Sequence, residues 1–107
     1  METADKKIQE IQVLEQNLHN ILLQKQAFQL ELSETQAALK EIEKAGEDVF
    51  KIVGQLMLKS DKKKIKEELL GKEKILSANA ESMEKQEKSI IGKLEGLKKE
   101  IEKLGKK

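Results

Sequence analysis

The stretch that decides the fold of this chain is Val49-Phe50-Lys51-Ile52-Val53-Gly54-Gln55-Leu56-Met57-Leu58-Lys59. Two short runs of β-prone residues flank Gly54-Gln55, and a Gly-X pair is typical of a type II′ two-residue turn. Such a turn places Val53 opposite Leu56 and Ile52 opposite Met57. The stretch therefore predicts a β-hairpin over about residues 48–59.

Both faces of this predicted hairpin are largely apolar. An isolated two-stranded hairpin is marginal in water, and its two edges leave backbone groups unpaired. We therefore expect other subunits to cover the hairpin and to complete a sheet or a barrel with it. The residues expected at this oligomer interface are Val49, Phe50, Ile52, Val53, Gly54, Leu56, Met57 and Leu58.

Before the hairpin, residues 11–42 show the heptad rhythm of a coiled coil. One row, with a residue every seven positions, contains Ile11, Leu18, Lys25, Leu32 and Leu39. The second row contains Leu14, Ile21, Phe28, Thr35 and Ile42. The rhythm predicts a helix over about residues 4–45 that packs against another helix. Two members, Lys25 and Thr35, are polar, and polar residues in such a seam often fix its register at some cost in stability.

The segment Lys44-Ala45-Gly46 predicts the end of this first helix. A lysine suits the negative end of the helix dipole, and Gly46 can adopt the left-handed conformation that often follows a helix. After the hairpin, Ser60 or Asp61 can cap a second helix, which we expect over about residues 61–105.

The second helix has a clear apolar row and a weaker companion row. The apolar row contains Leu69, Leu76, Met83, Ile90, Leu97 and Leu104. The companion row contains Glu73, Ala80, Glu87, Leu94 and Ile101, and becomes fully apolar only toward the C-terminus. Gly71, Gly92 and Gly96 lie inside this helix, and each costs about 1 kcal/mol relative to alanine. The second helix is therefore expected to be looser than the first.

The two helical segments carry opposite net charge. Residues 1–45 hold 5 lysines and 8 acidic residues, whereas residues 61–107 hold 14 lysines and 10 acidic residues. Opposite signs favour pairing of the two segments with each other. The predicted fold is mainly α, an antiparallel two-helix coiled coil forming a single domain over residues 1–107. Its short β-hairpin lies at one end, the proximal end, and both termini lie at the other, distal end.

Composition excludes several classes of function. The chain has no Cys, one His and a net charge of +1, so thiolate chemistry and a long-range field for nucleic acid or anionic lipid are excluded. His19 has no convergent partners, and no phosphate-binding loop or nucleophile-base pair is present. We therefore expect no enzyme, no cofactor and no metal. No apolar run approaches the roughly 20 residues of a membrane span and no signal-peptide pattern opens the chain, so a soluble, cytoplasmic protein is expected.

A run of lysines opens the second helix, at Lys62, Lys63, Lys64 and Lys66. Nucleic-acid binding is disfavoured, because arginine is absent and acidic residues follow at Glu67 and Glu68. Lysines at a helix start also oppose the helix dipole, so another contact should favour them. A solvated face is the default interpretation. Charge that deters aggregation at the sheet edge is one alternative, and docking to a partner is another.

The order helix, Val-Phe-Lys-Ile-Val-Gly hairpin and helix resembles the β-class subunits of prefoldin. The string from Glu47 to Lys59 carries most of the resemblance, with support from residues 32–41 and 67–69. The resemblance implies an archaeal-type heterohexamer of two α-type and four β-type subunits whose hairpins assemble into a β-barrel. It further implies that the distal coiled-coil tips hold unfolded polypeptides without ATP and pass them to a group II chaperonin. An acidic surface of that chaperonin is the partner to which the lysine run would dock, in the docking alternative given above.

The candidate client-binding residues lie near the free ends of the two helices, where the partner helix frays and apolar side chains become available. They are Ile8, Ile11, Val13 and Leu14 on the first helix, and Leu94, Leu97, Ile101 and Leu104 on the second. These residues alternatively serve only to close the coiled coil. A second class of function also stays open, a structural coiled-coil spacer without client binding; the apolar hairpin argues against it, because a plain spacer has no need of one.

Overall fold

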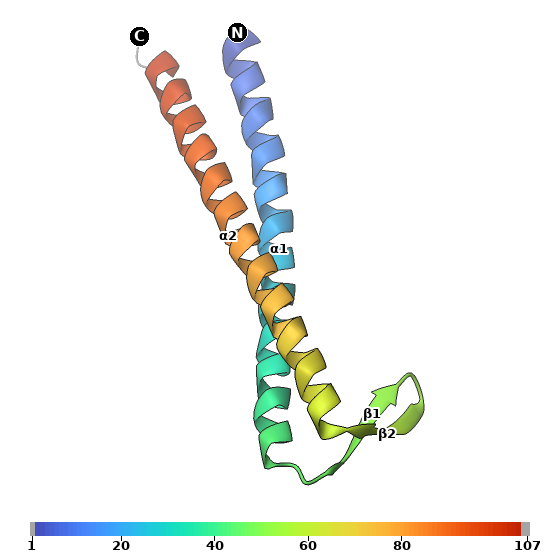
Figure 1. Cartoon of the computed structure of the whole chain (residues 1–107). Helices are drawn as coiled ribbons and strands as arrows, with labels where there is room; N and C mark the ends of the chain where they lie inside the picture. Colours follow the sequence, from blue (N-terminus) through green and yellow to red (C-terminus); the bar gives the residue numbers. More distant parts are fainter. Residues whose placement is uncertain (1, 106–107) are drawn as a thin grey trace. The chain divides into compact units, whose positions relative to one another are not determined.

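The computed structural model describes residues 2–105, which form two long helices joined through a β-hairpin (Figure 1). Helix α1 spans Glu2–Lys44 and helix α2 spans Lys62–Gly105. Strands β1, Asp48–Val53, and β2, Leu56–Asp61, form a two-stranded antiparallel sheet. The predicted fold class, paired helices with a hairpin between them, is confirmed.

The chain forms two compact units, which are described separately. The terminal unit contains the part of α1 up to Ala27 and the part of α2 from Ala80. The hairpin unit spans Phe28–Asn79 and contains the rest of both helices with the hairpin. The expectation of one single domain over residues 1–107 stays a prediction.

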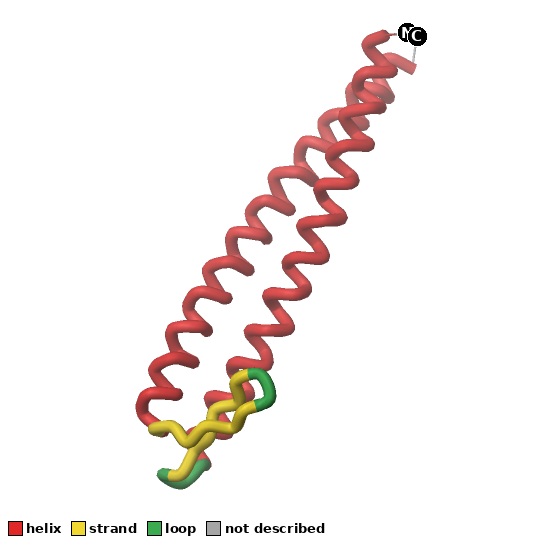
Figure 2. The backbone as a smooth tube through the Cα atoms, turned by 90° about the vertical axis from the view of Figure 1, so that its right-hand side faces the viewer, coloured by secondary structure: helices red, strands yellow, loops and turns green. Residues whose placement is uncertain are grey.

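In the terminal unit the two helices run antiparallel. Lys7 pairs with Glu100, and Lys25 pairs with Glu87, so residue numbers rise along α1 as they fall along α2. The start of α1 and the end of α2 accordingly lie at the same end of this unit in both views (Figures 1 and 2). The predicted seam is confirmed here, since its members are half-buried or, at Leu94, buried. The exception is Leu104, which is exposed.

In the hairpin unit the same two rows form a small core. Its most buried apolar side chains are Ile42 and Leu76, and Thr35 is also buried, with 3% of its surface exposed. The Thr35 hydroxyl donates a hydrogen bond of 2.8 Å to the backbone carbonyl of Glu31, one turn earlier. This bond satisfies the polar group within its own helix, so Thr35 joins the seam without leaving an unpaired donor.

The hairpin has the register that its turn residues predict. Val53 lies opposite Leu56 and Ile52 opposite Met57. Gly54 has a φ of 62°, whereas no non-glycine residue in the described part of the chain has a positive φ. A positive φ at the first central residue alone fits a type II′ turn and excludes type I′, which needs it at both.

Helix α1 ends at Lys44, as predicted, but the predicted left-handed conformation of Gly46 is wrong. Among the described glycines a positive φ occurs only at Gly54. The end of α1 is closed instead by the next helix: Lys62 Nζ donates a hydrogen bond of 2.8 Å to the carbonyl of Ala45. Because a lysine satisfies this terminal carbonyl, no left-handed turn is needed to do so.

Two of the lysines at the start of α2, Lys62 and Lys66, thus have side-chain partners. Lys66 forms an ion pair with Glu43 of α1. Lys62 donates the hydrogen bond to the Ala45 carbonyl described above. Asp61 acts as the expected cap, since its Oδ1 accepts a hydrogen bond of 3.2 Å from the backbone N–H of Lys63. These contacts explain why lysines occupy a helix start that the dipole disfavours.

Candidate functional site

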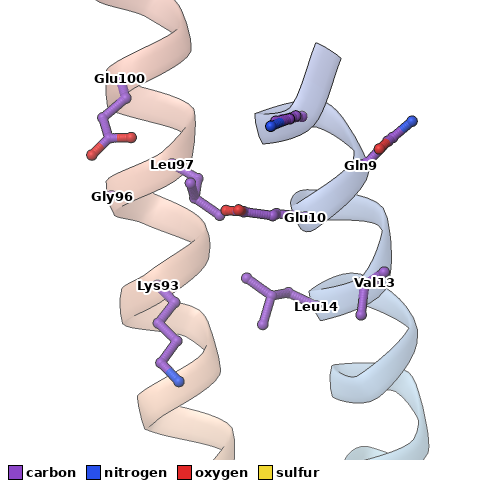
Figure 3. A pocket seen from close by; sticks show the side chains of 9 residues that line it. Gln9, Glu10, Val13, Leu14, Lys93, Gly96, Leu97 and Glu100 are labelled. Carbon is purple, nitrogen blue, oxygen red and sulfur yellow. The ribbon is translucent and has the colours of Figure 1, made fainter. Parts of the chain in front are cut away.

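An apolar groove lies between α1 and α2 in the terminal unit (Figure 3). Its volume is about 650 Å³. It is lined by Lys6, Gln9, Glu10, Val13, Leu14, Lys93, Gly96, Leu97 and Glu100. Three of these, Val13, Leu14 and Leu97, are among the predicted client-binding residues, and the structure brings them together.

The groove combines an apolar floor with a rim of both charges. Leu14 points from α1 toward α2, and the side chain of Glu10 reaches toward Leu97 (Figure 3). Val13 lies outside the seam rows and is 60% exposed. Gly96 contributes no side chain, and a Cβ built there meets no heavy atom within 4 Å. Such a surface offers apolar contact and long flexible side chains, without a fixed polar pattern that would select one ligand.

The other five predicted client-binding residues lie outside this lining. Ile8 and Leu104 are exposed, whereas Ile11 and Ile101 are half-buried. Leu94 is buried in the seam, with 6% of its surface exposed. Leu94 therefore offers almost no surface to another molecule in this conformation.

Sequence reasoning missed the polar rim and Gly96. Lys93, Gly96 and Glu100 lie four residues before, one before and three after Leu97. Positions three and four apart share a helix face, so a search around Leu97 at this spacing would have found Lys93 and Glu100. Gly96 carries no such signal.

An ion pair also crosses the seam within the terminal unit, further along both helices from the chain ends than the groove. Lys25 Nζ donates a hydrogen bond of 2.8 Å to Glu87 Oε2, and both side chains are about one-fifth exposed. This hydrogen bond raises the pKa of the Lys25 ammonium and outweighs burial, which acts in the opposite direction, while the charges of Glu87 and Glu84 add to it. One polar seam residue of each helix, Lys25 of α1 and Glu87 of α2, is thus the partner of the other.

The hairpin presents a second apolar surface, in the hairpin unit. Phe50, Ile52, Val53, Leu56, Met57 and Leu58 are 49–69% exposed, and Val49 is half-buried. Side chains opposite each other share a face of the hairpin and successive ones alternate. Ile52 and Met57 therefore share one face, and Val53 and Leu56 the other. Both faces are apolar and uncovered in the single chain.

One hairpin face also opens onto a groove of about 700 Å³ within the same unit. Phe50, Ile52 and Met57 line it from the hairpin, and Ile42, Ile65 and Leu69 line it from the helices. The apolar surface formed by the predicted oligomer-interface residues thus extends onto the end of α1 and the start of α2.

The remaining lysines of the α2 start and the single histidine lie on the surface. Lys63 and Lys64 are exposed, as is His19. Among residues 2–105 the structure shows no group of three or more His, Asp or Glu side chains that could hold a metal ion. No helix of this described range is both long and apolar enough to cross a membrane.

Comparisons of the sequence and of the fold with known proteins all point to the same family. The family model for prefoldin subunits matches residues 5–107. The chain is 42% identical over 90 residues to the prefoldin subunit beta of Thermococcus onnurineus, covering 82% of this chain and 78% of that one. It is 34% identical over 96 residues to the prefoldin subunit beta of Sulfurisphaera tokodaii, covering 88% and 77%.

The fold agrees with this likeness. The crystal structure of the prefoldin beta subunit from Thermococcus strain KS-1 matches with a TM-score of 0.89 and 34% identity, over 98% of this chain and 94% of that chain. Sequence and fold therefore agree over nearly the whole chain. The chain belongs to the prefoldin subunit family, in its β class.

Proposed function

We propose that this chain is a subunit of an ATP-independent chaperone that captures unfolded polypeptides and hands them to a group II chaperonin. The observation that carries the proposal is the apolar groove of the terminal unit, where exposed Val13 lies beside Leu14 and Leu97. Unfolded chains expose apolar segments, and burial of an apolar side chain is favourable without any nucleotide. The chain performs no catalysis in this function.

The size of the groove sets how strongly one chain binds. Burying one Val or Leu side chain contributes about 1.5–3 kcal/mol, and the ordering of a flexible segment offsets part of that gain. A single groove therefore binds weakly. Several grooves carried by one assembly reach one client together, and the effective concentration raises the overall affinity.

The hairpin supplies that assembly. We propose that it pairs with the hairpins of an α-type prefoldin subunit and of further copies of this chain, two α and four β, in a β-barrel. The support is its uncovered apolar surface on both faces. A plain coiled-coil spacer leaves this surface without a purpose. The exposed Lys63 and Lys64 are the lysines that remain available for chaperonin docking, and the assembly is proposed to act in the cytoplasm.

The test is suppression of aggregation by the complex of this chain with an α-type partner. The probe is disulfide-reduced, unfolded lysozyme. We expect Val13→Ser to weaken capture by several-fold, because it removes exposed apolar area from the groove. Leu30→Ser is the matched control: Leu30 lies on the same helix and is 62% exposed, but belongs to the hairpin unit and not to the groove.

Two results would contradict the proposal. Equal capture by the Val13→Ser and unsubstituted complexes would remove the groove from the site. Complete absence of capture by the unsubstituted complex would remove the chaperone function and favour the spacer.

A further inference from the structure

Leu94 lies between two glycines on α2, in the segment Gly92-Lys93-Leu94-Glu95-Gly96. Its side chain is buried in the seam of the terminal unit, with 6% exposed. Gly96, two residues further on, lines the apolar groove together with Leu97, which lies about one helical turn from Leu94. Leu94, a buried apolar side chain about one turn from the groove, therefore lies in a stretch of helix that has a glycine two residues before it and another two residues after it.

Packing does not require these glycines. A Cβ built at Gly92 or at Gly96 meets no heavy atom within 4 Å, so alanine fits at both positions without a clash. Each glycine instead weakens the helix and raises the equilibrium constant for local opening by about fivefold relative to alanine.

We infer that the Gly92–Gly96 segment of α2 yields locally, so that Leu94 leaves the seam and joins Val13, Leu14 and Leu97 in contact with a bound polypeptide. The inference rests on the proposed capture function and deepens it. The groove then has an adjustable apolar area, small when empty and larger when a client supplies new cover for Leu94.

The energetics favour this arrangement over a fixed groove. A leucine that moves from the seam to an apolar client exchanges one apolar environment for another, so its own transfer is nearly neutral. The remaining cost is the local disruption of helix hydrogen bonds, and glycines reduce that cost. Clients that bury little apolar surface leave the segment closed.

The experiment compares Gly92→Ala with Gly71→Ala in the complex with an α-type partner. Gly92 is not part of the groove lining, so alanine there changes helix stability and leaves the groove surface unchanged. Gly71 lies on the same helix with equally open surroundings, but in the hairpin unit. Two measurements are made: hydrogen exchange of the amides in residues 92–97 without client, and suppression of aggregation of reduced lysozyme.

We expect Gly92→Ala to slow exchange of these amides by about fivefold and to weaken capture by a similar factor. Gly71→Ala should leave both unchanged. Unaltered capture by Gly92→Ala, or an equal loss with Gly71→Ala, would overturn the inference while leaving the proposed function standing. Failure of the unsubstituted complex to capture lysozyme would overturn the proposed function and this inference with it, whatever the exchange rates.

Discussion

Lys25 and Glu87 illustrate what single residues contribute to this molecule. Each occupies a seam position where an apolar side chain is usual, and each satisfies the other through the 2.8 Å bond between Lys25 Nζ and Glu87 Oε2. Sequence identifies Lys25 as a polar exception and Glu87 as part of a weak row. It does not pair them, because the pairing depends on how far the two helices slide past each other, which a heptad rhythm leaves undetermined.

The pair predicts non-additive effects of substitution. Lys25→Leu or Glu87→Leu alone should lower the melting temperature, because each leaves a half-buried charge without its partner. The double substitution should recover the melting temperature of the unsubstituted chain or exceed it, since two leucines restore an apolar seam. Thermal unfolding followed by circular dichroism measures all three. Simple additivity of the two single effects would show that the residues do not interact.

Glu43 predicts a dependence of stability on acid pH. The hydrogen bond from Lys66, together with the charges of Lys66 and Lys62, holds the pKa of the Glu43 carboxyl below its usual value. A depressed carboxyl pKa contributes stability that is present above the unfolded-state pKa and is lost as pH falls through the folded-state pKa. Glu43→Gln should therefore lower the melting temperature at neutral pH, modestly for an exposed pair, and the difference should vanish in strong acid. A difference that grows toward acid pH would contradict this origin.

At the scale of elements, the hairpin turn was predictable because its geometry is local. A Cβ built at Gly54 meets no heavy atom within 4 Å, so close packing does not require a glycine there. The glycine is needed because the backbone at this position has a φ of 62°. The two strands then follow in register without any information from the rest of the chain.

This turn predicts a substitution effect at the hairpin. Gly54→Ala should cost about 1–2 kcal/mol per hairpin through backbone strain alone. Association with partner subunits should weaken by about tenfold, the equivalent of 1.4 kcal/mol. Gln55→Ala is the control, because Gln55 has no positive φ. Dilution of the assembled complex, followed by light scattering, measures the effect; an unchanged dissociation midpoint for Gly54→Ala would show that turn strain does not control assembly.

The end of α1 shows where prediction from sequence fails. Gly46 follows the helix at the position where a left-handed glycine is common, yet Lys62 of the next helix closes the end instead. That contact joins residues 17 positions apart across the hairpin, so no local pattern reports it. The exposure of Leu104 and the burial of Leu94 could not be predicted for a related reason: the heptad positions are regular, but the exposure of a side chain depends on what the facing helix places opposite it.

At the scale of the whole molecule, the single chain leaves the apolar side chains of its hairpin uncovered. Its helices bury their seams against each other, while six large side chains of its hairpin stay 49–69% exposed. An exposed apolar surface of this kind on an unpaired sheet edge marks an interaction site or an aggregation hazard. Sequence predicts this need for partners from the apolar hairpin. It does not predict the assembly formed, since the number and order of subunits depend on surfaces of other chains.

The measurement that tests the central claim most directly is the native mass of this chain, alone and mixed with an α-type prefoldin subunit. We predict one discrete hetero-oligomer with four copies of this chain and two of the partner, and its loss when Ile52 and Met57 are both replaced by lysine. Retention of a one- or two-chain coiled coil that ignores the partner, with the hairpin substitutions without effect, would contradict it.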